Sequence, residues 1–198
     1  MAAAMTLARL RRFARANDGV VALEFAFLAL PFLFMIFALL ELALVFLLAA
    51  SLDTAMERAA RGIRTGGFQG ANATASIPDQ KKAFEDEVCA HMAWIAPACG
   101  ASLKVDVQVF DEWSKTNAAE PMIEPVVDAD GKVIGKKFDP SKTVFSAGGP
   151  RSIVLVRGYY QWPMLTPLLS QAVVNLQGNK ALITSTQTFR NEPYAAST

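Results

Sequence analysis

Residues 20–50 read VVALEFAFLALPFLFMIFALLELALVFLLAA and contain neither Lys nor Arg. Of these 31 positions, 28 are hydrophobic, and the exceptions are Glu24, Pro31 and Glu41. The run is far longer than the roughly 7–15 residues that form the core of a cleavable signal peptide. Because about 20 apolar residues are enough to cross a bilayer, the sequence predicts a transmembrane helix over residues 20–50.

The charges before this run predict its orientation. Residues 1–19 hold four arginines and a single acid, Asp18. By the positive-inside rule, this basic leader stays in the cytoplasm and everything after about residue 50 lies on the far side of the membrane. The lipid bilayer is therefore an expected partner. The whole chain has 19 Lys+Arg, 18 Asp+Glu and a formal net charge of +1, which argues against a nucleic-acid binder.

Two acids interrupt the apolar run, and each needs an explanation. An acid in hydrocarbon costs about 2.5–3.5 kcal/mol on insertion scales, so it usually has a partner or a function. Sixteen helical residues rise about 24 Å, so Glu41 reaches the outer headgroups if Glu24 lies near the inner ones. Many chains with one amino-terminal apolar run use it as an anchor alone. Glu24, four residues into the run, argues for a further role.

The stretch Gly19-Val20-Val21-Ala22-Leu23-Glu24-Phe25 resembles the processing site of type IV pilins. In that family a basic leader ends in Gly, cleavage follows it on the cytoplasmic side, and the fifth mature residue is Glu. The resemblance implies that a prepilin peptidase cuts between Gly19 and Val20, and that Glu24 and Phe25 set the register of the helix in an assembled filament. This chain departs from the closely related major pilins at two positions: its first mature residue would be Val20 instead of Phe, and its sixth would be Phe25 instead of Tyr.

The segment after the apolar run indicates which group of type IV pilin-like proteins the chain resembles. Residues 51–64 read SLDTAMERAARGIR, with a helical stripe of apolar residues, and Gly66-Gly67 is a suitable helix stop. We therefore expect the membrane helix to continue as an amphipathic stalk of about 45 residues in total, roughly 67 Å long. This pattern is similar to the TadE-like family, pilin-like proteins of the tight-adherence (Tad) branch of the type IV pilus systems. The closing segment, residues 189–194, also resembles that family.

The resemblance implies a minor pilin, or pseudopilin, that takes part in building a Tad-type pilus for surface adhesion. Its partners would be the prepilin peptidase, other pilin subunits and the Tad assembly machinery. The protein would sit in the bacterial inner membrane with one span and a periplasmic carboxyl-terminal domain, and could enter the extracellular pilus. The alternative is an uncleaved, signal-anchored periplasmic scaffold of a secretion or pilus assembly complex.

The remaining chain predicts a small α+β domain with an antiparallel sheet. We expect a helix over residues 79–93 and strands over residues 103–110, 152–162 and 181–190, with a small hairpin around Asp130-Gly131. Residues 111–150 indicate no role. The predicted organisation is a leader (1–19), a transmembrane helix (20–50), a helical extension (51–66), a linker (67–78) and an exported domain (79–198).

Cys89 and Cys99 are the only cysteines, and the predicted topology places both outside the cytoplasm. An even pair in an oxidising compartment favours a disulfide. Metal binding with His91 is the rival interpretation, but two Cys and one His lack a fourth ligand and the spacing is not that of a zinc site. No cofactor is indicated. With one His and no nucleophile elbow, phosphate loop or HExxH motif, we expect that the chain is not an enzyme.

Overall fold

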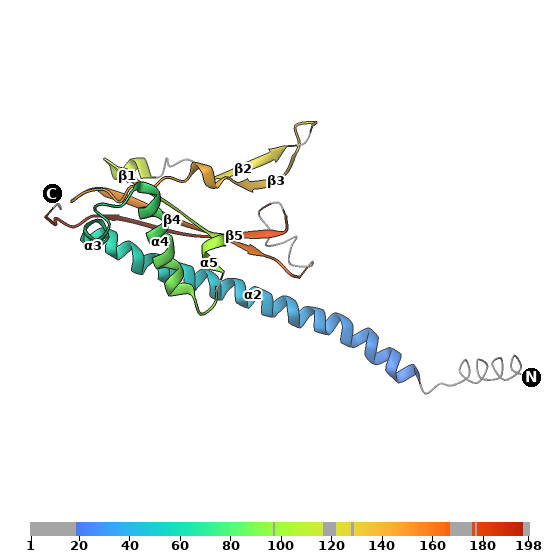
Figure 1. Ribbon diagram of the computed structural model, residues 1–198. Helices are drawn as coiled ribbons and strands as arrows, with labels where there is room; N and C mark the ends of the chain where they lie inside the picture. Colours follow the sequence, from blue (N-terminus) through green and yellow to red (C-terminus); the bar gives the residue numbers. More distant parts are fainter. Residues whose placement is uncertain are drawn as a thin grey trace, which may run out of the picture. The chain divides into compact units, whose positions relative to one another are not determined.

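A computed structural model describes residues 19–96, 98–116, 122–127, 129–166, 176 and 178–195 (Figure 1). The predicted leader, apart from Gly19, lies outside the described residues, as does most of the segment 163–176. The chain divides into two compact units, Met1–Leu40 and Glu41–Thr198. We call them the amino-terminal and carboxyl-terminal units.

The longest element is α2, which runs from Val20 to Thr65 through Pro31. Among the described residues, α2 is the one helix long and apolar enough to cross a membrane. It ends where the sequence predicts: Gly66 has a φ of 83°, a left-handed conformation that glycine adopts without steric cost. The expected fold class, a long apolar helix followed by a small α+β domain, is confirmed.

A three-stranded antiparallel sheet forms the frame of the carboxyl-terminal unit, with strand order β1-β4-β5. β1 (Leu103–Phe110) pairs with β4 (Ile153–Pro163), and β4 pairs along its whole length with β5 (Lys180–Arg190). The three strands predicted from the sequence are therefore present. The smaller elements of this unit are α3 (Gly67–Ala71), α4 (Ile77–Met92), α5 (Cys99–Ser102), α6 (Trp113–Thr116) and the 3-10 helix η2 (Pro140–Lys142).

The main core lies between one face of this sheet and two helices, α4 and the part of α2 beyond Glu41 (Figure 1). Residues of α2 that line it are fully or almost fully buried: Leu48, Leu52, Ala55, Met56, Ala59, Ala60 and Ile63. Glycine allows the close approach, because a Cβ at Gly158 of β4 would lie 2.8 Å from the sulfur of Met56. Each large apolar side chain buried in this way stabilises the folded unit by about 1.5–3 kcal/mol. The unit therefore depends on α2 for much of its core.

The other face of the sheet is covered near β2 (Ile123–Val127) and β3 (Val133–Phe138), the expected hairpin. Phe138 packs on Tyr159 with ring centroids 4.9 Å apart. Asp106 alternates along β1 with Val105 and Val107 and so lies on the opposite face of the strand, yet it is fully buried. Its carboxylate accepts hydrogen bonds from both Nε and Nη2 of Arg157, at 3.1 and 2.7 Å, and from the Val144 amide at 2.9 Å.

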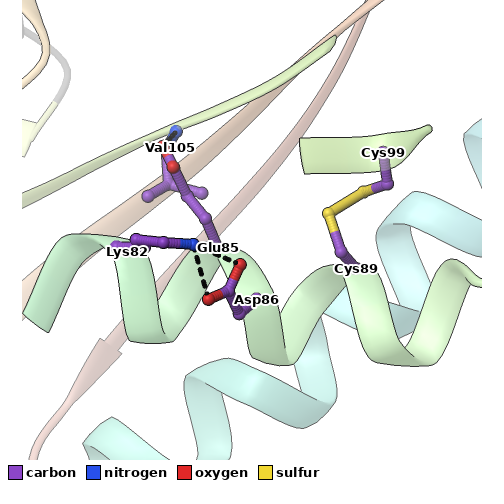
Figure 2. The surroundings of a disulfide bond; sticks show 6 residues. All are labelled: Lys82, Glu85, Asp86, Cys89, Cys99 and Val105. Atoms are coloured by element: carbon purple, nitrogen blue, oxygen red, sulfur yellow. Dashed lines mark hydrogen bonds and ion pairs between the residues drawn. A yellow bond between two sulfur atoms is a disulfide. The ribbon is translucent and has the colours of Figure 1, made fainter. Parts of the chain in front are cut away.

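Helix α4 begins at Ile77, two residues before the predicted start. The Ser76 hydroxyl accepts a hydrogen bond from the Asp79 amide and Pro78 stands in the first turn, so the end of the predicted linker is the helix cap. Figure 2 shows a disulfide joining Cys89 of α4 to Cys99 at the start of α5, with Cα atoms 5.5 Å apart. Glu85 of the same helix accepts a hydrogen bond from the Val105 amide of β1. Together these contacts hold α4 to the edge of the sheet.

Replacing Cys89 and Cys99 with Ala, singly and together, tests how much this cross-link stabilises the unit. A loop of this length contributes about 2–3 kcal/mol in the chain-entropy model, so urea unfolding of the full chain should show a loss of that size. The double variant should lose little more than either single variant, because one substitution already removes the bond. Labelling of both cysteines by a thiol probe in the unreduced native chain would contradict the disulfide.

Candidate functional site on the amino-terminal helix

The residues of the predicted processing site lie at the very start of α2. Gly19 directly precedes the helix, and Val20 is its first residue. A Cβ built on Gly19 would meet nothing within 4 Å, and Gly19 is not among the residues with a positive φ. Neither packing nor backbone conformation in the described structure therefore explains why this position is a glycine.

Glu24 lies one helical turn after Val20, on the same side of the helix. Its side chain is exposed, as are those of Val20 and Phe25. If the chain began at Val20, the free amine and the carboxylate would stand in the i,i+4 relation that stabilises opposite charges on a helix. The same exposed carboxylate is also accessible to a cation from another molecule.

The surroundings of Glu24 are apolar. Between Val20 and Leu40, most large hydrophobic side chains are exposed, including Phe27 at 78% and Leu28 at 73%. Apolar surface of this extent marks a site for lipid or for other apolar helices. In either environment an unpaired carboxylate has a high free-energy cost, so Glu24 is expected to pair with a cation.

Glu41 differs from Glu24 because its carboxylate is buried, with 6% of the residue exposed. It accepts hydrogen bonds from two consecutive backbone amides in the loop after β4, those of Leu165 and Thr166, the latter at 2.7 Å. The base of this loop is fixed in turn, because the Met164 amide donates to the Asn179 carbonyl and the Asn179 side-chain amide donates to the Met164 carbonyl. We call this contact between Glu41 and residues 165–166 the Glu41 latch.

The opposite end of the unit's helix is held by the closing segment of the chain. The Glu192 amide donates to the Arg64 carbonyl at 2.8 Å, and the two side chains form an ion pair at 3.6 Å. The Tyr194 ring lies against Gly66, where a Cβ would come within 2.5 Å of it. Partial burial raises the pKa of the Tyr194 hydroxyl, which receives a hydrogen bond from Gln69 at 2.9 Å.

Next to this contact, Asn191 is almost fully buried, and its side-chain amide donates to the carbonyls of Ala147 and Gly149. The segment 190–194 therefore ties the end of α2 to the loop before β4. Sequence reasoning singled out this segment only through its resemblance to a family, and the structure gives it a packing role.

The predicted functional residues fall into two groups. Gly19, Val20, Glu24 and Phe25 form one continuous stretch in the amino-terminal unit, and the Cys89–Cys99 disulfide lies in the carboxyl-terminal unit. Because the two cysteines are bonded to each other, they are not free to act as metal ligands with His91. Within the described residues, no group of three or more His, Cys, Asp or Glu is placed to hold a metal ion.

Replacing Glu41 with Gln tests the latch. The amide group keeps the shape but offers one acceptor oxygen in place of two, so at least one of the two backbone amides loses its partner. Hydrogen bonds to charged groups are worth about 1.5–3 kcal/mol, so hydrogen exchange at Leu165 and Thr166 should rise about tenfold or more. The measurement is hydrogen–deuterium exchange of the full chain in detergent.

Glu24→Gln is the matched control, because this acid is exposed and should leave exchange at residues 165–166 unchanged. Unchanged exchange at both positions in the Glu41→Gln chain would show that the latch does not hold the loop.

Comparison with known proteins adds one match. Residues 19–61 match the family model described as TadE-like protein. No curated protein and no solved structure matches the chain. The matched segment begins at Gly19 and contains Glu24 and Glu41, whereas the closing segment 189–194 lies outside it. The TadE-like family suggests involvement in Tad pilus assembly. The resemblance inferred from the sequence is thus confirmed over residues 19–61, where the chain is similar to the TadE-like family.

Proposed function

We propose that this protein is a minor pilin, or pseudopilin, that takes part in building a Tad-type pilus for surface adhesion. The observation that carries the proposal is the coincidence of three boundaries: the TadE-like match begins at Gly19, the helix begins at Val20, and the basic leader ends between them. The role is one of assembly, through helix packing, and not of catalysis.

In this proposal a prepilin peptidase hydrolyses the Gly19–Val20 peptide bond, leaving a carboxylate on Gly19 and an ammonium group on Val20. The cut falls directly before Val20, the first residue of α2, so α2 keeps all of its residues. Nothing inside the described chain requires a glycine at position 19. A glycine there is consistent with recognition by the active site of a peptidase, where a side chain would be excluded.

The new ammonium group would lie at the positive end of the helix dipole, an unfavourable place for a cation unless an acid is near. Glu24 supplies that acid. In a filament, the Glu24 carboxylate would pair with the Val20 ammonium of a neighbouring subunit, and this pairing would fix how far one helix slides along the next. Phe25 would pack beside it and help to set the same register.

Before assembly, the protein would lie in the inner membrane, with its amino terminus in the cytoplasm and its carboxyl-terminal unit in the periplasm. The four arginines before the apolar run support this orientation. The carboxyl-terminal unit is far larger than the short domain expected of the major pilins of such a system, which supports a minor component. The prepilin peptidase, other pilin subunits and the Tad assembly machinery are the proposed partners.

Two substitutions separate processing from assembly. Gly19→Ala should block removal of the leader, seen as a single slower band on immunoblots of native membranes. Glu24→Ala should leave processing intact and reduce the number of pili per cell about tenfold or more, since losing an ion pair in an apolar surface costs at least about 1.4 kcal/mol per subunit. Pili are counted by electron microscopy.

Glu112→Ala is the matched control, since Glu112 is an exposed acid of the carboxyl-terminal unit and should affect neither result. A normal number of pili on the Glu24→Ala strain would contradict the proposal that Glu24 sets the register of the helix in the filament. If the wild-type chain keeps its leader in membranes where other prepilins are cut, the uncleaved scaffold becomes the better description.

A further inference from the structure

Several large apolar side chains of the carboxyl-terminal unit are exposed close to the Glu41 latch. Leu165, whose backbone amide binds Glu41, is 80% exposed. On α2 itself, Leu44 and Leu47 are 46% and 45% exposed. Trp94, just after α4, is 67% exposed. Exposed Leu and Trp side chains are costly in water when they form a contiguous apolar patch, and such a patch on a protein surface marks an interaction site.

Trp94 and Leu47 lie at the same level of the unit. Both line a groove of about 290 Å³ between α2 and the end of α4, together with Ala50 and Ser51. Leu47 is six residues beyond Glu41, or about 9 Å along the helix axis. The exposed apolar side chains therefore occupy a narrow band, from the level of Glu41 to a point about 10–15 Å further along α2.

The length of α2 places this band near the outer edge of a bilayer. A hydrocarbon core about 30 Å thick takes about 20 helical residues, so a span that begins between Val20 and Glu24 ends between about Leu40 and Leu44. The band starts where the span ends. It is continuous along the chain with the exposed apolar surface of residues 20–40, the segment that makes α2 a candidate membrane helix.

The Glu41 latch allows the loop that holds Leu165 and Thr166 to lie at the edge of the hydrocarbon. Backbone amides near hydrocarbon must be hydrogen-bonded within the protein, because no water is available there. The amides of Leu165 and Thr166 both donate to Glu41, and the Met164 amide and carbonyl are bonded to Asn179. The loop thus exposes the side chain of Leu165, while the backbone amides of residues 164–166 are all hydrogen-bonded within the protein.

The groove becomes polar with distance from Glu41. Beyond Ser51 its lining includes Thr54, Arg58 and His91. A change from Leu and Trp to hydroxyl and cationic groups over a few helical turns is the gradient of a membrane interface, where Trp rings favour the headgroup level and basic side chains favour the phosphates.

We propose that Leu44, Leu47, Trp94 and Leu165 form a lipid-contacting surface, with which the carboxyl-terminal unit rests on the outer face of the bilayer. Trp94 lies at the headgroup level and Leu165 at the edge of the hydrocarbon. The membrane-spanning part of α2 ends near Leu44, and residues 45–50, predicted as part of the span, lie in the interface and support the unit.

Quenching of tryptophan fluorescence by brominated phosphatidylcholine tests this surface with the full chain in proteoliposomes. The chain has three tryptophans, Trp94, Trp113 and Trp162. Trp113→Phe leaves Trp94 and Trp162, and Trp94→Phe leaves Trp113 and Trp162, so the two variants differ only in which exposed tryptophan remains. Trp113 follows the end of β1 that is far from the β4–β5 loop, which makes it the matched control.

Trp113→Phe should be quenched about twofold or more strongly than Trp94→Phe, because bromine quenches only over short distances and interfacial Trp lies within them. In the Trp94→Phe background, Leu165→Trp should restore strong quenching. Val144→Trp should not, since Val144 is an exposed residue beside the middle of β1. Equal quenching within either pair overturns the proposal. Because this readout needs no peptidase and no pilus, it stands or falls separately from the proposed function.

Discussion

The fold of the carboxyl-terminal unit depends on the burial of one stripe of α2 against an antiparallel sheet. Leu52, Met56, Ala59 and Ile63 lose all their solvent contact there, and Gly158 of β4 leaves the space that Met56 fills. The strands cannot bury this face without the helix, and the helix cannot remain apolar on this side in water without the strands. The part of α2 beyond Glu41 is therefore the helix on which the carboxyl-terminal unit folds, and the apolar residues before it make α2 a candidate membrane helix.

Two acids on this helix show how environment assigns roles to the same side chain. Glu41 is satisfied inside its own chain by the amides of Leu165 and Thr166, so it acts as a structural contact. Glu24 is exposed among apolar side chains. The cost of an acid in such surroundings makes a partner from another molecule the most economical explanation. The contrast agrees with the proposal that Glu24 takes part in assembly, whereas Glu41 binds the loop after β4 within its own unit.

The sequence predicts much of this fold because its signals are local. Alternation in residues 103–110 marks β1, the left-handed preference of Gly66 marks the end of α2, and the lone pair of cysteines marks the disulfide. The partners of Glu41 could not be predicted, because backbone amides carry no sequence signal and the loop is 124 residues away. The burial of Asp106 could not be predicted for a related reason, because alternation shows which residues share a face of the strand but not what covers that face.

The mass of the mature amino terminus, measured on protein purified from its native membrane, tests the central claim most directly. The account predicts a chain that begins at Val20, with residues 1–19 removed and a disulfide between Cys89 and Cys99 retained. A chain that still carries the four arginines of its leader would contradict it. Such a result would leave the TadE-like helix as an anchor for a periplasmic scaffold.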